Sequence, residues 1–283
     1  MIFRLLIILL LLFQFPALHA QKGHPLLDSA AGSFCHGDTL TTISYLEAFL
    51  KQYVPVSKEG NARGIIGLRL GEFYLGRNEL EIARDKLLEA FPYSTRKREL
   101  YYYRDSCGLF KLFRRMYTTA YICEALYNVY MELNEPANAI QYLQLADGRY
   151  MPTFDWCVNG MNNYKAYLSL KFADFYCKAG DTTRAINRLL DYAFCGEYYS
   201  IEATLLLKKL LYTRYTPHQV RKEIRRGIAN FKKVYSIGDD GKIRYRYEWW
   251  IFNNRPGFYF SERSLRLNKR IIRKNYFLNL LMK

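Results

Sequence analysis

The sequence predicts an all-α protein built from hairpins of paired helices, with a basic, aromatic C-terminal extension. Three observations lead to this prediction. One set of large and small apolar residues recurs three times with helical spacing inside each copy. Helix-breaking residues divide each copy into two halves. Half of the 283 residues are hydrophobic, so the chain can bury a substantial core.

Residues 1–20 have the order of a secretory signal peptide. Arg4 precedes an apolar run from Leu5 to Phe13, and Pro16 with small residues leads to Ala20. A membrane-spanning helix needs about 20 apolar residues, so we expect cleavage after Ala20 rather than an anchor. No Asn-x-Ser/Thr sequence is present, which favours a bacterial envelope over a glycosylating route. The sequence therefore predicts export, to the periplasm or the outside of a bacterial cell.

A helical domain is expected over residues 21–235. Residues 39–54 have the pattern of a helix that packs on the first recurring unit. The recurring set is Leu70, Tyr74, Ala83, Leu87 and Ala90. Shifted by 56 and then by 46 further residues, the set falls on Leu126, Tyr130, Ala139, Leu143 and Ala146, and on Phe172, Tyr176, Ala185, Leu189 and Tyr192.

This set, with Gly71 beside Leu70, resembles the tetratricopeptide repeat, a helix–turn–helix unit of about 34 residues. The resemblance implies units at about 64–97, 120–153 and 166–199. In such units small residues let two helices approach closely, and stacked neighbours cover the remaining apolar face. The resemblance thus implies an α-solenoid of helix hairpins.

The breaks in the pattern fall where this arrangement needs turns. Gly76 ends one helix, and Asn78 with Glu81 predicts a capping box that opens the next. Pro136 suits a first helical turn, and Gly180-Asp181 stops one helix and caps its successor. Residues 200–215 and 216–235 have the pattern of a degenerate fourth pair, with Thr216 as the cap.

Residues 236–283 differ in chemistry from the rest of the chain. From Leu205 onward there are 20 Lys and Arg against 5 Asp and Glu, which accounts for nearly all of the net charge of +16. Residues 243–251 alternate apolar and charged side chains, which predicts a strand after the turn signal at 238–241. Residues 258–267 fit a second strand or the start of a final helix that runs to Leu281.

Six cysteines, at positions 35, 107, 123, 157, 177 and 195, follow the predicted signal peptide. Export favours disulfides among them, but the sequence allows 15 complete pairings and selects none. For Cys123 and Cys177, burial as small apolar residues inside helices is an equal alternative. The sequence predicts no metal site and no cofactor, because no Cys-x-x-Cys or comparable ligand spacing is present.

No catalytic motif is found, so an enzyme is not expected. The resemblance implies instead that the first helix of each pair lines a concave groove for an extended or helical segment of an envelope protein. By register, the groove residues would be Ile65, Leu68, Glu72, Tyr121, Glu124, Asn128, Tyr167, Leu170 and Asp174. Their acidic and polar character favours a basic or aromatic peptide.

The alternative is a module that binds an anionic surface, either lipid phosphates or acidic glycans, through the basic extension. Its candidate residues are Arg244, Arg246, Arg263, Arg266, Lys269, Arg270, Arg273 and Lys274. Nucleic acid is not the expected target, since strand alternation would direct aromatic rings and guanidinium groups to opposite faces. Neither the oligomeric state nor the identity of the partner follows from the sequence.

Overall fold

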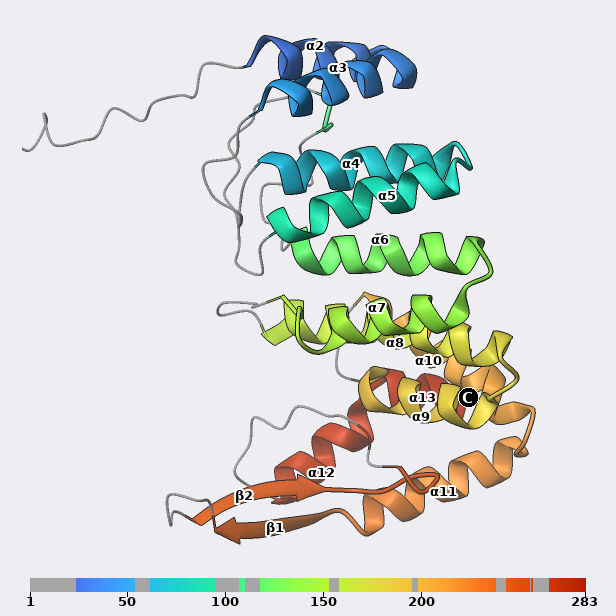
Figure 1. The fold of residues 1–283 in the computed structure, drawn as a ribbon. Coiled ribbons are helices and arrows are strands. Elements are labelled where there is room, and N and C mark those ends of the chain that lie inside the picture. Colours follow the sequence, from blue (N-terminus) through green and yellow to red (C-terminus); the bar gives the residue numbers. More distant parts are fainter. Residues whose placement is uncertain are drawn as a thin grey trace, which may run out of the picture. The chain divides into compact units, whose positions relative to one another are not determined.

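The computed structural model describes residues 24–53, 62–94, 107–109, 118–152, 158–194, 198–237, 243–254, 256 and 265–283. Within these ranges the chain forms twelve α-helices, one short 3-10 helix and two β-strands (Figure 1). None of the helices in these ranges is long and apolar enough to cross a membrane. The predicted signal peptide lies outside the described residues.

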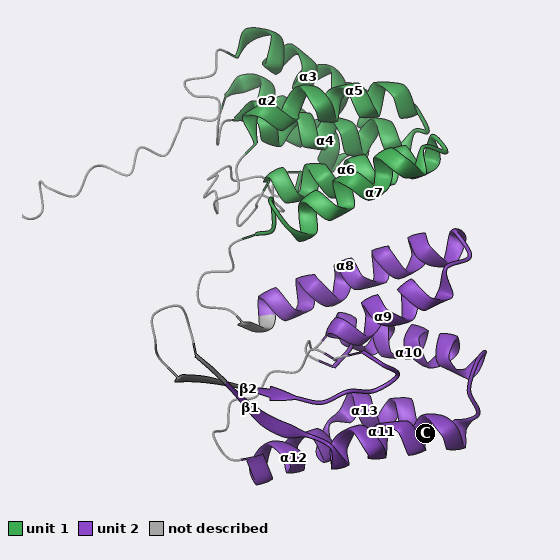
Figure 2. Cartoon of the chain, turned by 60° about the horizontal axis from the view of Figure 1, so that its bottom comes forward, with its two compact units in different colours: residues 1–153 green, residues 154–283 purple. Residues whose placement is uncertain are grey.

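The chain divides into two compact units, residues 1–153 and 154–283 (Figure 2). Unit 1 contains three helix hairpins and a 3-10 turn, namely α2 (Pro25–Cys35) with α3 (Thr39–Gln52), α4 (Ala62–Gly76) with α5 (Leu80–Ala90), η1 (Phe91–Tyr93), and α6 (Thr118–Glu132) with α7 (Pro136–Asp147). Unit 2 contains α8 (Val158–Lys178), α9 (Thr182–Tyr192), α10 (Tyr199–Tyr212), α11 (Pro217–Ala229), β1 (Lys232–Ile237), β2 (Ile243–Glu248), α12 (Leu265–Lys274) and α13 (Tyr276–Met282). The prediction of sequential helix hairpins is confirmed.

Small residues sit at the helix contacts, as the recurring set predicts. Ala83, Ala139 and Ala185 are completely buried in the second helices of their hairpins. On α4 the contact is closer still, because a Cβ added at Gly67 would lie 2.5 Å from the Cβ of Ala90. The two backbones can approach this closely only where side chains are absent or minimal.

The turns inside three hairpins share one hydrogen-bonding geometry. A residue with positive φ follows the first helix, and the next backbone N–H donates to a carbonyl five residues back, as in a Schellman motif. The positive-φ residues are Asn78, Asn134 and Gly180. The N–H···O pairs are Glu79 to Tyr74 at 2.9 Å, Glu135 to Tyr130 at 2.8 Å and Asp181 to Tyr176 at 2.8 Å. The recurring tyrosine therefore marks the same place in each hairpin.

This geometry corrects one prediction and confirms another. Asn78 does not cap α5, because it adopts the left-handed conformation that ends α4, and Glu79 is the N-cap residue without a side-chain capping bond. Asn tolerates positive φ better than most residues, so it suits the position after the end of a helix as well as the N-cap of the next one. Asp181 caps α9 as predicted, accepting a hydrogen bond from the Arg184 N–H at 2.9 Å.

A fourth turn of this kind joins α2 to α3, although α2 was not predicted. Gly37 has positive φ, and the Asp38 N–H donates to the Ser33 carbonyl at 3.0 Å. The Asp38 carboxylate then caps α3 by accepting from the Thr41 N–H at 3.0 Å. The pair Gly37-Asp38 repeats Gly180-Asp181, so this turn carries the sequence signal that would have identified α2.

The predicted strand at 243–251 is confirmed as β2, but its partner is not the expected one. β2 pairs antiparallel with β1, and Ile237 lies opposite Ile243. The residues of β1 were assigned to the end of a helix, which instead stops at Ala229. Phe231, at the start of β1, stacks on Tyr247 of β2 with ring centroids 5.4 Å apart, so an aromatic contact supports the pairing. The predicted turn at 238–241 lies outside the described residues.

The C-terminal extension belongs to the core of unit 2. Trp249, Ile251 and Ile272 are buried in one apolar cluster with residues of α9, α10 and α11, and Leu278 and Leu281 of α13 join it. The predicted final helix is divided into α12 and α13 at Asn275, whose side chain accepts from the Leu278 N–H at 2.9 Å. The sequence therefore changes in composition near residue 235, whereas the chain divides into its two compact units between residues 153 and 154.

Candidate functional site

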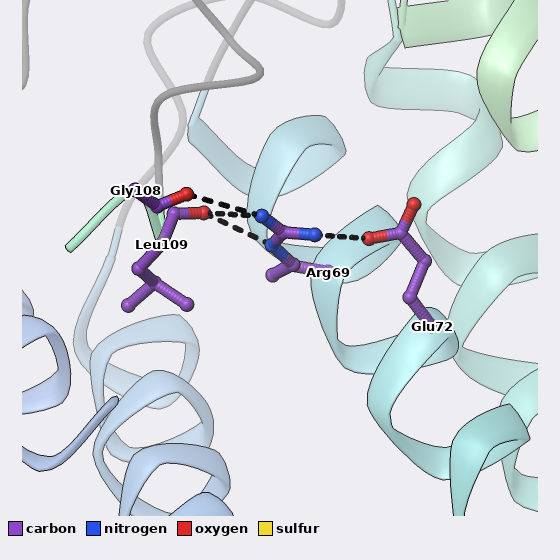
Figure 3. Close-up of polar contacts among 4 residues, drawn as sticks. All are labelled: Arg69, Glu72, Gly108 and Leu109. Atoms are coloured by element: carbon purple, nitrogen blue, oxygen red, sulfur yellow. Dashed lines mark hydrogen bonds and ion pairs between the residues drawn. The ribbon is translucent and has the colours of Figure 1, made fainter. Parts of the chain in front are cut away.

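The first predicted groove segment, on α4, is covered by the chain itself (Figure 3). The Arg69 side chain donates to the Leu109 carbonyl through Nε at 2.9 Å and Nη2 at 2.8 Å. Nη2 also lies 3.4 Å from the Gly108 carbonyl, and Nη1 donates to Glu72 Oε2 at 2.7 Å. A disulfide between Cys35 and Cys107 fastens the same segment to the end of α2. We call Cys107, Gly108 and Leu109 the strap.

Two of the predicted groove residues on α4 are buried. Leu109 is completely buried, and so are Ile65 and Leu68 on α4, with exposures of 1% and 0%. The Glu72 side chain is partly exposed, but its carboxylate forms an ion pair with Arg69. The expectation that Ile65 and Leu68 face a partner is therefore corrected, because both side chains belong to the core of unit 1.

The α6 positions differ among themselves. Tyr121 is 38% exposed, and Asn128 is half-buried two residues before the recurring Tyr130. Glu124 is 7% exposed and thus contributes to the interior rather than to a surface. In unit 1, Tyr121 and Asn128 remain as groove candidates together with the outer part of Glu72.

The α8 positions in unit 2 are more accessible. Tyr167 and Leu170 are half-buried, and Asp174 is exposed. The Tyr167 ring packs against Tyr199 of α10 with centroids 5.1 Å apart, so these two helices share a surface. Asp174 Oδ2 is 3.0 Å from Lys178 Nζ, an i,i+4 ion pair that partly neutralises the predicted acidic position.

Three exposed apolar residues at the neighbouring helix were not predicted. Tyr198, the N-cap residue of α10, is 69% exposed. Ile201 and Leu205 of α10, three and then four residues further on, are 41% and 49% exposed. The opposite face of α10 buries Ala203, Leu207 and Leu211. The leucines at positions 205, 206, 207, 210 and 211 cover more than one face of a helix, and this was the signal available in the sequence. Leu170 packs against the buried core cluster of unit 2. We call Tyr198, Ile201 and Leu205, with Tyr167 that packs on Tyr199, the α8–α10 face.

The basic extension presents its cations mainly on α12. Arg266, Arg270, Arg273 and Lys274 are exposed, whereas Lys269 Nζ donates to the Ala229 carbonyl at the end of α11, at 3.1 Å. The cation at that carbonyl complements the negative end of the α11 dipole. Arg263 and the side chains of Arg244 and Arg246 lie outside the described part of the structure.

Two aromatic residues of the extension, Tyr247 and Trp249, are buried. Tyr247 is 7% exposed and Trp249 1%, and the Trp249 ring lies 6.3 Å from that of Phe194. Trp250, between Trp249 and Ile251, is 52% exposed. The alternation seen in the sequence thus places the Tyr247 and Trp249 rings in the core of unit 2.

The described cysteines form one disulfide and two free thiols, of which one is buried and one half-buried. Cys35 pairs with Cys107, and both Cys123 and Cys177 are free, whereas Cys157 and Cys195 lie outside the described residues. Burial, with the Glu124 charge as the second cause, raises the pKa of the Cys123 thiol to about 12. Among the described residues, no three His, Cys, Asp or Glu side chains gather in a way that could hold a metal ion.

Comparison with known proteins adds no assignment. No protein-family model matches the chain, and no curated protein resembles it closely enough to count as a relative.

Proposed function

We propose that this chain is an exported protein-interaction scaffold of the cell envelope, built on tetratricopeptide-like helix hairpins. The observation that carries the proposal is the α8–α10 face, where Ile201 and Leu205 expose apolar side chains one helical turn apart. Contiguous exposed apolar surface of this kind is typical of interaction sites. It lies on the first helices of consecutive pairs, which is where the resemblance puts a groove.

The partner that suits this face is a peptide segment with aromatic or aliphatic anchors. Asp174 is paired with Lys178, so little free negative charge is left on this part of α8 for a purely basic peptide. Helix-in-groove recognition uses apolar anchors at three- and four-residue spacing, which matches the spacing of Tyr198, Ile201 and Leu205.

Export is proposed from the sequence of residues 1–20. The Cys35–Cys107 disulfide supports it, because structural disulfides persist in oxidising compartments outside the cytosol.

A crosslinking experiment with matched variants tests the scaffold. The wild-type chain and Ile201→Glu/Leu205→Glu are compared in envelope extracts, with Ile82→Glu as the control because Ile82 is 44% exposed on the second helix of its pair. The proposal expects one set of partners to be lost from the double variant and kept by the control. Identical partner sets for all three proteins would reject the α8–α10 face.

A second candidate function is attachment to an anionic surface through α12. Leu267 is 44% exposed and Ile271 37%, beside the exposed Arg270 and Lys274. A helix with exposed cations and neighbouring apolar residues suits the headgroup region of an anionic membrane. Binding to vesicles that contain an anionic phospholipid should fall with salt and with Leu267→Glu/Ile271→Glu. Vesicle binding that is unchanged by added salt and by the double substitution would exclude this candidate function.

A further inference from the structure

Four basic side chains on α11 form a surface feature separate from the α8–α10 face and from α12. His218, Arg221, Lys222 and Arg225 lie at positions i, i+3, i+4 and i+7, so they share one side of the helix. All four are exposed, and together they line a hollow in the surface of unit 2. We call this feature the α11 hollow.

The surrounding structure fixes the direction in which these side chains point. Thr216 and Gln219 form a capping box, in which the Gln219 N–H donates to Thr216 Oγ1 at 3.2 Å and the Thr216 N–H to Gln219 Oε1 at 2.8 Å. Val220, Ile224 and Ile228 bury the opposite side of α11. The helix therefore cannot rotate to disperse its charges without exposing its apolar face.

The charge of the α11 hollow is not compensated by the chain. Glu223, the one carboxylate of α11, faces away from it, accepts from the Phe252 N–H at 2.9 Å and pairs with Arg226 at 2.6 Å. No carboxylate in the described ranges pairs with Arg221, Lys222 or Arg225. Like charges one turn apart destabilise a helix, so a bound anion would relieve a repulsion that the fold leaves in place.

We propose that the α11 hollow binds a ligand with two or more linked phosphate groups. Arginine guanidinium groups suit phosphate oxygens because they donate two parallel hydrogen bonds, and lysine adds a point charge. Seven residues of helix extend over about 10 Å, which is longer than a single phosphate. The ligand is a soluble polyphosphate or a phosphorylated lipid headgroup, and both offer this chemistry.

Calorimetric titration of the full chain with tripolyphosphate tests the site. The test variant is Arg221→Gln/Arg225→Gln, and the control is Lys209→Gln/Lys232→Gln, which removes the same charge from exposed positions of unit 2 outside α11 and α12. Circular dichroism checks that both variants keep the helical content of the wild type. We expect the affinity to fall at least tenfold in the test variant and less than twofold in the control.

Parallel arms separate the ligand sources and the competing explanation. If the test variant also loses retention on vesicles with a phosphorylated headgroup, the ligand is a lipid, whereas unchanged retention assigns it to a soluble polyphosphate. Equal losses in the two variants, or no loss in either, would overturn the proposal. So would tighter binding of a tetraglutamate peptide than of tripolyphosphate, since that would identify a carboxylate site.

Discussion

The Tyr74 hydroxyl of α4 donates a hydrogen bond to the Glu47 carboxylate of α3 at 3.0 Å. Lys86 of α5 reaches the same carboxylate at 2.9 Å, so Glu47 connects three helices. The recurring tyrosine thus has two roles in this hairpin, because its backbone carbonyl closes the turn and its side chain joins the preceding hairpin. The contact is local to unit 1 and can be tested there.

Tyr74→Phe and Glu47→Gln should each destabilise α3 and α4 by about 0.5–1.5 kcal/mol, the usual contribution of one hydrogen bond. Because both residues serve the same contact, the double variant should lose less than the sum of the single losses. Hydrogen exchange of the α3 and α4 backbone amides measures this locally. Tyr53→Phe is the control, since the Tyr53 hydroxyl has no hydrogen bond with the described residues. Strictly additive losses would show that Tyr74 and Glu47 do not interact.

The same contact predicts a pH dependence. Burial, with the hydrogen bond to Glu47 second, raises the pKa of Tyr74 to about 12 from 10.0, so its stabilisation is complete below pH 10 and is lost as the pH rises towards 12. Burial alone would raise the pKa of Glu47, but hydrogen bonds from Lys86 and Tyr74 outweigh it and lower the pKa below 4.5. Its stabilisation is therefore present above pH 4.5 and is lost in acid.

The difference in stability between wild type and Tyr74→Phe should consequently be greatest from about pH 5 to pH 10 and shrink on both sides. Urea unfolding at a series of pH values, followed by circular dichroism, measures this difference. A difference that is constant from acid to alkali would contradict the assignment.

Gly67→Ala should destabilise the α4–α5 hairpin by about 1–3 kcal/mol, since overpacking forces the two helices apart. The new Cβ would lie 2.5 Å from the Ala90 Cβ. Gly32→Ala is the matched control, because Gly32 is inside α2 and a Cβ there meets nothing within 4 Å. There the change should stabilise by about 0.5–1 kcal/mol through helix propensity. Hydrogen exchange of the backbone amides measures both effects. If Gly67→Ala changed the exchange of α4 as Gly32→Ala changes that of α2, the close contact between Gly67 and Ala90 would be contradicted.

Removing the disulfide with Cys35→Ala/Cys107→Ala should lower the unfolding free energy by up to about 4 kcal/mol, the chain-entropy expectation for a loop of this length. The two cysteines are 72 residues apart. Urea unfolding with and without reductant measures the loss. The double variant should no longer respond to reductant, and an unchanged wild type in reductant would show that the strap is held by Arg69 and burial alone.

Cys123 should resist alkylation in the native chain at pH 8, and it should react once the chain is unfolded. With a pKa of about 12 only roughly one thiol in ten thousand is ionised at that pH, and burial also blocks the reagent. Mass spectrometry after iodoacetamide treatment identifies the labelled cysteines. Because Cys177 is only half-buried, labelling of Cys123 at the rate of Cys177 would contradict the burial of α6.

Much of the hairpin architecture could be predicted because helix packing leaves a local signature. The spacing of Ala83, Leu87 and Ala90 reports one buried helix face, and two later copies repeat it. Capping signals were less specific, since Asn78 was expected to open α5 but instead follows the end of α4 in the left-handed conformation. Strand pairing was missed because the partner of β2 comes before it in the chain, and period-two patterns do not identify partners.

The candidate site was predicted less well than the fold. Ile65 and Leu68 have the register of groove residues, but both side chains are buried in the core of unit 1. The strap depends on a disulfide that the sequence could not select among its cysteines. Ile201 and Leu205 were not singled out from the sequence, because apolar character alone does not show which side of a helix lacks a neighbour.

The amino-acid sequence by itself determined the helix hairpins, their turns and the concentration of positive charge near the C-terminus, because each depends on residues close together in the chain. Tertiary structure alone decided that Cys107–Leu109 covers α4, that Trp249 enters the core of unit 2, and that α10 and α11 leave apolar and basic faces open. Those outcomes depend on contacts between segments that are distant in the sequence. Whether a residue is buried depends on which of these segments pack against it.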